Sequence, residues 1–452
     1  GKWKKQLQLI NWLIKTKRCK IVMNKFLIIF LFATIGVKAQ ERLTLEDAIQ
    51  TALQYNYDVR IAKAAARQAA ANNTLGNAGF SPSVGLNGGV TASNYNTHNE
   101  LVNGTVQDNP HARTINVNGS AALNWTLFDG GRMFIVKKQL NELDKMGEQQ
   151  FKAQLQNTVS RIIQVYAQAV LQQRQLLAID TALVLAVTRM NISKVKYDNG
   201  SAPKVDYLQA RVDYNGRRAD SLTQQALLTQ SFDTLNVLMG ADIYNTYILD
   251  DSLPLNTKLE PMDKEALQDI NYTIDVARRN ARVSRLNVGA TRAYQYPWLA
   301  VNGAYNYSRT KSDAGFSFFS RSYGPNAGAT ISMPLFQGGN LRRQVKIASL
   351  QATRDELLYE KQMSSTTNKY RNAWRSYQVA VAAYKLQQEN IQYAKENLDV
   401  QLARFRVGIA TTIETRQAEN DYVTALEALY TAGYNLKVNE TIVLELENKL
   451  IQ

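Results

Sequence analysis

Apolar and polar residues alternate with a period of two in four segments of the chain, two in each half. The segment TINVNGSAALNWTL (114–127), for example, places Ile115, Val117 and Leu123 on one face and mostly Asn, Ser and Thr on the other. Such alternation predicts strands with one apolar face. We therefore expect β-hairpins at 82–128 and 297–336, each with a polar loop between its two strands.

These strands have the length and the flanking residues of membrane-spanning strands. A tilted strand needs about 9 to 11 residues to cross an outer membrane, and the alternating runs are about 10 to 14 residues long. Aromatic side chains, which favour membrane interfaces, gather at their ends: Phe80, Trp125, Phe128, Tyr294, Tyr296, Trp298 and Phe336. A soluble hairpin with one buried face has the same pattern, so this alternative stays open.

The pattern changes to a helical period immediately after two matching junctions, LFDGG and LFQGG. The proline-free segments that follow, 131–198 and 339–406, predict helices of about 100 Å at 1.5 Å per residue. A returning helix with heptad spacing is expected after each, and every proline is expected in a loop, at a strand end or at a helix start. Glycine pairs let the backbone turn from strand to helix. The residues of the two junctions are Phe128, Gly130 and Gly131, and Phe336, Gly338 and Gly339.

The two halves of the chain are similar in sequence. YDNGSAPKVDYLQARVDY (197–214) aligns with FRVGIATTIETRQAENDY (405–422) at an offset of 208, which the two junctions share. Segments upstream of the hairpins align at an offset of 215. We expect a duplication, with repeat 1 at 41–255 and repeat 2 at 256–452. Each repeat then holds a helix, a β-hairpin and a long helical hairpin, with tips near 200 and 408.

The N-terminal residues have the features of a targeting signal. Residues 23–40 combine Lys25, a twelve-residue apolar core and a Val-Lys-Ala sequence, which predicts a secretory signal peptide. Residues 1–22 are expected to lie outside the native mature protein. Removing both segments removes nine basic residues and the only cysteine, leaving 44 basic against 38 acidic residues. The remaining charge does not indicate nucleic-acid binding, and without a Cys no thiol site is expected.

The sequence offers no recognisable catalytic or cofactor site. The two histidines, His98 and His111, both fall in the expected first hairpin loop. A metal site there is the alternative to a solvated loop. No GxGxxG or P-loop motif occurs. We therefore expect no enzyme activity, no metal and no cofactor.

Four strands cannot close a barrel, for which about eight is a practical minimum. Because open strand edges cannot face lipid, several chains would have to combine their strands. Three chains would supply twelve strands, an even number in the usual range. The fold class predicted is therefore an α+β membrane protein in which a shared barrel continues into a helical barrel.

The duplicated junctions and the turns YDNGSAPKVDYLQA and FRVGIATTIETRQA resemble those of the TolC family of bacterial outer-membrane channel proteins. The resemblance extends over about 41–452. It implies a homotrimer with a 12-stranded outer-membrane barrel and a periplasmic α-helical barrel. It also implies export with two partners, a periplasmic adaptor and an inner-membrane pump.

The resemblance also implies roles for particular residues. The family's hairpin tips dock the adaptor, and the matching residues here are Lys196, Tyr197, Gly200, Arg404, Phe405, Val407, Gly408 and Ile409. A plain turn glycine without a docking role is the alternative. The family's narrow periplasmic entrance corresponds to Asp206, Glu414 and Gln417. A carboxylate that merely starts a helix is the alternative there. Because Ala410 and Gln417 depart from the family's charged positions, an entrance latched by ion pairs is not expected.

The expected function is therefore a passive exit duct of a tripartite efflux or type I secretion system. The duct would lie in the bacterial outer membrane and extend into the periplasm. A periplasmic coiled-coil adaptor or scaffold without a barrel is the competing hypothesis. The sequence does not identify the cargo.

Overall fold

The structure, a computed structural model, describes residues 41–250, 253–314 and 317–451. The expected signal peptide and upstream segment lie outside these residues. The first half contains β1 (Glu41–Leu43), α2 (Leu45–Tyr55), α3 (Tyr57–Asn72), β2 (Ser83–Glu100), β3 (Val106–Asp129), α4 (Arg132–Asp198) and α5 (Lys204–Met239). The first half ends with β4 (Tyr247–Leu249). The second half contains α6 (Lys264–Ile270), α7 (Tyr272–Ala293), β5 (Trp298–Ser312), β6 (Phe319–Ser332), α8 (Asn340–Arg406) and α9 (Thr412–Leu446).

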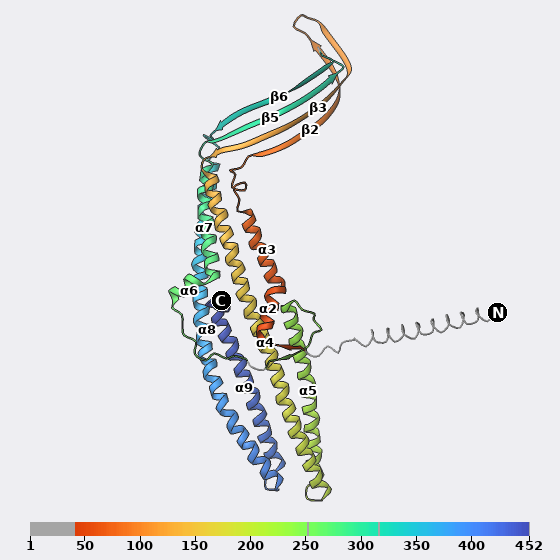
Figure 1. The fold of residues 1–452 in the computed structure, drawn as a ribbon, viewed down its shortest axis with the longest axis vertical. Coiled ribbons are helices and arrows are strands. Elements are labelled where there is room, and N and C mark those ends of the chain that lie inside the picture. The colour runs from red at the N-terminus through yellow and green to blue at the C-terminus, as the bar shows by residue number, and fades with distance from the viewer. Residues whose placement is uncertain (1–40, 251–252, 315–316, 452) are drawn as a thin grey trace, which may run out of the picture.

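The molecule is elongated, with the long strands at one end and the helical tips at the other (Figure 1). Helices α4 and α8 have 67 residues each, so each extends for about 100 Å. The long helices predicted from the sequence are therefore confirmed. The returning helices α5 and α9 lie beside the halves of α4 and α8 nearest the tips, whereas α3 and α7 lie beside the halves nearest the strands.

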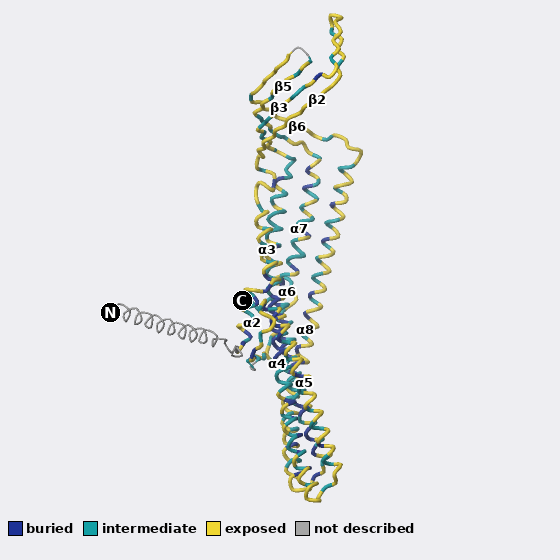
Figure 2. Tube along the Cα trace, turned by 90° about the vertical axis from the view of Figure 1, so that its right-hand side faces the viewer, coloured by how far each residue is buried: buried dark blue, intermediate teal, exposed yellow. Residues whose placement is uncertain are grey.

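The helices form a single curved layer. Helix α4 contacts α3 and α7 near the strands, and contacts α5 and α9 near the tips; α8 contacts α7 and α9. The order across the layer is thus α3–α4–α7–α8 near the strands and α5–α4–α9–α8 near the tips. Buried residues concentrate in the middle of the body, where the short elements pack against this layer (Figure 2).

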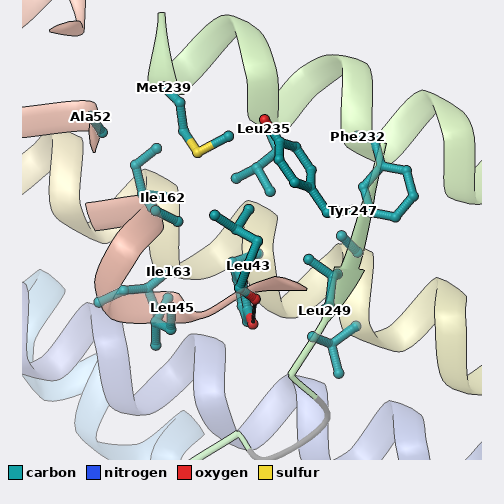
Figure 3. Packing of buried hydrophobic residues seen from close by; sticks show 14 of the residues in the cluster. Leu43, Leu45, Ala52, Ile162, Ile163, Phe232, Leu235, Met239, Tyr247 and Leu249 are labelled. Carbon is teal, nitrogen blue, oxygen red and sulfur yellow. Dashed lines mark hydrogen bonds between the residues drawn. The ribbon is translucent and has the colours of Figure 1, made fainter. Parts of the chain in front are cut away.

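The main apolar core lies at this middle level. β1 pairs in parallel with β4, which brings together the two ends of repeat 1. Their side chains meet those of α2, α4 and α5 (Figure 3). The Tyr166 hydroxyl donates to the backbone oxygen of Leu43 at 2.9 Å, which satisfies the polar end of a fully buried ring. The core therefore holds both ends of repeat 1 against its helices.

The segment that leads from β4 to α6 is held by two buried tyrosines of α8. The Tyr370 hydroxyl accepts a hydrogen bond from Met262 N at 2.7 Å, and the Tyr377 hydroxyl accepts one from Leu259 N at 3.1 Å. Tyr370 also donates to Glu447. Burial raises the pKa of Tyr370 to about 12, so this donor stays protonated at neutral pH.

The four long strands form one antiparallel sheet in the order β2–β3–β5–β6. Its register aligns Leu123 with Gly303 and Asn124 with Asn302, so the apolar face predicted from the alternation is continuous across strands. Many apolar side chains on this face are largely exposed, including Val84, Leu86 and Ile331. β2 and β6 are the two edges, and neither has a second partner strand among the described residues.

The β2–β3 ribbon continues beyond the point where β3 leaves β5, and it projects from the end of the molecule (Figure 1). This corrects the expected polar loop, because His98 and His111 both lie in strands. A ribbon with water on both faces needs no apolar alternation, so the sequence pattern did not mark it as strand.

Two prolines also lie inside strands, contrary to expectation. Pro110 lies in β3, within the stretch where the β2–β3 register shifts between Tyr95 and Thr97. Pro325 lies in β6, an edge strand of the sheet. A bulge and an edge are the two places where a strand tolerates the missing N–H of proline.

Helix α4 contains an 18-residue stretch that could cross a membrane by length and composition alone, and a third of that stretch is buried. Helix α4 also packs along α5, α9, α7 and α3. These contacts are those of a core helix of the body.

Candidate functional site

The strand-to-helix junctions use glycines in the left-handed conformation. Gly130 and Gly131 have φ values of +73° and +83°, and Gly338 and Gly339 have +58° and +73°. Helices α4 and α8 begin directly after these pairs. Asp129 Oδ1 accepts a hydrogen bond from Met133 N at 3.0 Å, as expected for an acceptor at a helix start.

Gly130 is also required by close packing. A Cβ at this position would lie 2.4 Å from the backbone oxygen of Ala293 and 3.0 Å from the Cβ of Tyr296. At the matching Gly338, a Cβ would meet nothing within 4 Å. The first junction is therefore pressed against the second half of the chain, and the second junction is open.

The two hairpin tips, 196–201 and 404–409, close in the same way. Gly200 and Gly408 have φ values of +72° and +81°. Ser201 N donates to Lys196 O at 2.8 Å, and Ile409 N donates to Arg404 O at 2.9 Å. This pattern is a glycine-dependent helix end in both tips.

The tips touch each other through Lys196 and Phe405. Lys196 Nζ lies 4.2 Å from the centroid of the Phe405 ring, a cation–π distance, and 3.3 Å from the Phe405 backbone oxygen. Tyr197 instead stacks on Tyr207 within the first hairpin, with 6.5 Å between ring centroids.

Exposure divides the expected docking residues. Val407 and Ile409 are 71% and 69% exposed, so these apolar side chains are available to a partner. Phe405 is only 2% exposed. Direct docking through Phe405 does not fit this burial, and the ring supports the contact between tips instead. The sequence position alone could not distinguish these two situations.

The three expected entrance residues have different surroundings. Glu414 forms a capping box with Thr411: its Oε2 accepts from Thr411 N at 2.7 Å, and Glu414 N donates to Thr411 Oγ1 at 3.2 Å. Asp206 lies in the first turn of α5 without a capping bond. Gln417 donates to Asp421 at 2.7 Å, as Gln209 does to Asp213 at 3.1 Å. A helix-starting role is thus clear for Glu414.

Lowering the pH should loosen the first turn of α9. The hydrogen bonds from the Thr411 backbone and hydroxyl lower the pKa of Glu414 below 4.5. Ionised Glu414 therefore stabilises the turn above its unfolded pKa, and this contribution is lost as the pH falls through the lower folded pKa. Hydrogen exchange of the amides at 412–416 measures this. Glu414→Gln keeps an acceptor oxygen but has no carboxyl to titrate, so its exchange rates should not show this loss of protection as the pH falls. An equal loss of protection in this variant would contradict the assignment.

A buried ionic cluster joins the two helical hairpins above the tips. Arg189 on α4 is 3% exposed; its Nη1 lies 3.2 Å from Asp213 Oδ2 on α5, and its Nε lies 3.3 Å from Glu419 Oε2 on α9. Arg416 Nη1 lies 3.8 Å from the same Asp213 oxygen. Arg189 Nε, Arg189 Nη1 and Asp213 Oδ2 make no hydrogen bond with a described residue. The contacts of the cluster are therefore ionic, but they are not aligned as hydrogen bonds.

The cluster faces a cavity of about 360 Å³ that is also lined by Arg217, Asp220 and Asn420. Burial raises the pKa of the Glu419 carboxyl, and the nearby Arg189 charge only partly opposes this shift. The sequence did not reveal this cluster, because its members come from three helices and lie within ordinary charged helical segments. Charged side chains therefore link the two hairpins. They do so at Arg189, Asp213 and Glu419, and not at the family's charged positions, which Ala410 and Gln417 occupy here.

No group of three or more His, Asp or Glu side chains suited to a metal ion occurs in the described residues. His98 instead pairs with Asp108 across the β2–β3 ribbon.

Comparisons with known proteins match this chain to outer-membrane proteins of bacteria. The sequence matches the family described as "Outer membrane efflux protein" over residues 48–241 and 265–445. "Outer membrane protein TolC" of Vibrio cholerae is 22% identical over 299 residues, which cover 65% of this chain and 66% of that protein, just under two thirds. "Probable efflux pump outer membrane protein TtgC" of Pseudomonas putida is 22% identical over 85% of this chain and 78% of its own.

The fold is also found among solved structures. The Campylobacter jejuni CmeC outer membrane channel superposes with a TM-score of 0.76 at 16% identity, covering 90% of this chain and 86% of CmeC. At this identity the likeness shows the fold alone.

Proposed function

The chain belongs to the outer membrane efflux protein family, and we propose that it is a passive exit duct. In this proposal it carries substrates from a pump and its periplasmic adaptor across the periplasm and the outer membrane, in a tripartite efflux or type I secretion system. The observation that carries the proposal is the direct connection of the sheet, with its exposed apolar face, to a helical layer about 100 Å long.

Three chains would complete the duct. β2 and β6 are open edges at the two sides of a four-stranded sheet, and open edges are not stable in lipid. Pairing β6 of one chain with β2 of the next closes a 12-stranded barrel. The apolar face would then meet lipid, and the Asn- and Ser-rich face would line a wet lumen.

The flanks of the helical layer support the same arrangement. Ile61 on α3 and Ile347, Leu350 and Leu357 on α8 are each more than half exposed. α3 and α8 are the outermost helices of the layer. Packing α8 of one chain against α3 and α5 of the next would cover these side chains and close the helical barrel.

The tips are the proposed docking surface for the adaptor. Val407 and Ile409 present apolar side chains on either side of Gly408, at the far end from the sheet. The proposed entrance lies just inside these tips, where three copies of Asp206 and Glu414 would favour the passage of cations.

The first experiment is the native mass of the mature protein. We expect detergent extraction of the membrane fraction to yield a particle of three chains, because closing the sheet removes both edges. Analytical ultracentrifugation with the bound detergent subtracted gives this mass, and extraction without detergent is the control. A monomer or dimer in the detergent-free soluble fraction would reject the duct and favour the scaffold.

A further inference from the structure

A large pocket lies where the sheet meets the helical layer. Its volume is about 830 Å³, within the 300–1,000 Å³ typical of small-molecule sites. Its walls come from the ends of β3, β5 and β6 and from α4, α7 and α8. The lining residues on which the argument depends are Asp129, Arg132, Tyr294, Tyr296, Trp298 and Gln337.

The register places this pocket on the polar side of the sheet. Asp129 lies opposite Trp298, and Trp298 lies opposite Ser332. Because side chains alternate between faces, Trp298 shares its face with Asn302 and Asn306, whereas Leu299 points to the apolar side. In the proposed barrel the polar side is the lumen, so the pocket opens into the duct.

The pocket combines aromatic rings with a carboxylate. Tyr294, Tyr296 and Trp298 are between 39% and 53% exposed. Only Met133 N bonds to the Asp129 carboxylate among the described residues, through Oδ1, which leaves Oδ2 for a ligand. Aromatic faces beside an anionic oxygen attract organic cations. The Arg132 guanidinium lies over the Tyr294 ring at 5.2 Å, and among the described residues that line the pocket it is the one opposing charge.

The residues that line this pocket differ from those at the matching positions of the other repeat. At the repeat offset of 215, the counterparts of Tyr294, Tyr296 and Trp298 are Gly79, Ser81 and Ser83. The counterpart of Asp129 at the offset of 208 is Gln337. The first half therefore lacks the rings that the second half supplies, and a trimer would contain three pockets at one level of the duct.

We propose that this pocket is a contact site in the duct wall for planar aromatic cations. The proposal rests on the proposed function and names a substrate class for it. A cation would stack on Trp298 and Tyr296 and place its charge toward Asp129. Binding in a conducting path must be weak enough for release, so the site would hold cargo briefly at the transition from the helical barrel to the strand barrel.

Ethidium binding to the purified detergent-solubilised trimer tests the site by fluorescence anisotropy. Asp129→Asn keeps the acceptor for Met133 N and removes the charge, and Trp298→Leu removes a ring. Each should weaken ethidium binding about tenfold. Arg132→Gln should strengthen binding, because it removes the like charge. Phe128→Leu, at the same level on the apolar face, is the matched control and should leave binding unchanged.

Several results would overturn the site. Equal ethidium affinity in all four variants would show partition into the detergent, and tighter binding of the anion anilinonaphthalene sulfonate would reverse the charge preference. The native mass separates the two proposals. A membrane-extracted trimer without pocket-dependent ethidium binding rejects only the site, whereas a monomer or dimer in the detergent-free soluble fraction rejects the duct itself.

Discussion

Arg189→Met is expected to destabilise the helical hairpins by about 3–5 kcal/mol, because it leaves the buried Glu419 carboxylate and the partly buried Asp213 carboxylate without their shared cation. The loss should appear as faster hydrogen exchange in α4, α5 and α9 near the cluster, with the sheet unaffected. Arg218→Met, at an exposed position on α5, is the matched control. Unchanged exchange in Arg189→Met would contradict the structural role of the cluster.

The charge on Glu419 allows a second test of the same cluster. A raised folded pKa means that Glu419 contributes most stability below its unfolded pKa, and that this is lost as the pH rises through the folded value. Glu419→Gln resembles the protonated form, so it should be much less damaging than Arg189→Met. It should also abolish the pH dependence of exchange near the cluster. A Glu419→Gln variant as unstable as Arg189→Met would show that the attraction between Arg189 and ionised Glu419 exceeds the free-energy cost of burying the Glu419 charge.

Gly130→Ala is expected to prevent most of the protein from assembling. The added methyl group would overlap the Ala293 backbone oxygen at 2.4 Å, in a left-handed conformation that already strains alanine. Together these effects should exceed about 3 kcal/mol. Gly338→Ala has the same left-handed backbone strain but no steric overlap, so it should destabilise the protein by about 1 kcal/mol.

The yield of trimer and its thermal dissociation, followed by gel mobility, compare these two variants. Equal yields would show that the junction relaxes around the methyl group and that Gly130 serves only as a turn.

The elements governed by local chemistry could be predicted from the sequence. Helices α4 and α8 followed from long proline-free segments, and the junctions followed from paired glycines. The seven-residue spacing on the returning helices marked two sets of residues: Tyr214, Leu228 and Leu235, and Tyr422, Leu429, Leu436, Val443 and Leu450. Leu235, Leu436 and Val443 are fully buried, and the other five are half-buried. In each case a repeated pattern within a short segment determines the conformation.

Features that depend on contacts between distant segments could not be predicted. Phe405 looked like an exposed tip residue, but Lys196 from the other hairpin covers its ring. The pairing of Arg189 with Glu419 joins residues 230 positions apart. The β2–β3 ribbon was missed for another reason: both of its faces are polar, so it has no alternation to detect.

The ionic cluster also bears on how such a chain can evolve. At the repeat offset of 208, the counterpart of Arg189 is Asn397 and that of Glu419 is Arg211, so the cluster exists in only one of two possible places. To build the ring of the proposed trimer, a half-length ancestor would have needed six identical copies, and any mutation would have appeared in every tip. Fusing two copies into one gene allows the tips to diverge as two sets of three. One set can then specialise in holding the ring together while the other is free to acquire new partners.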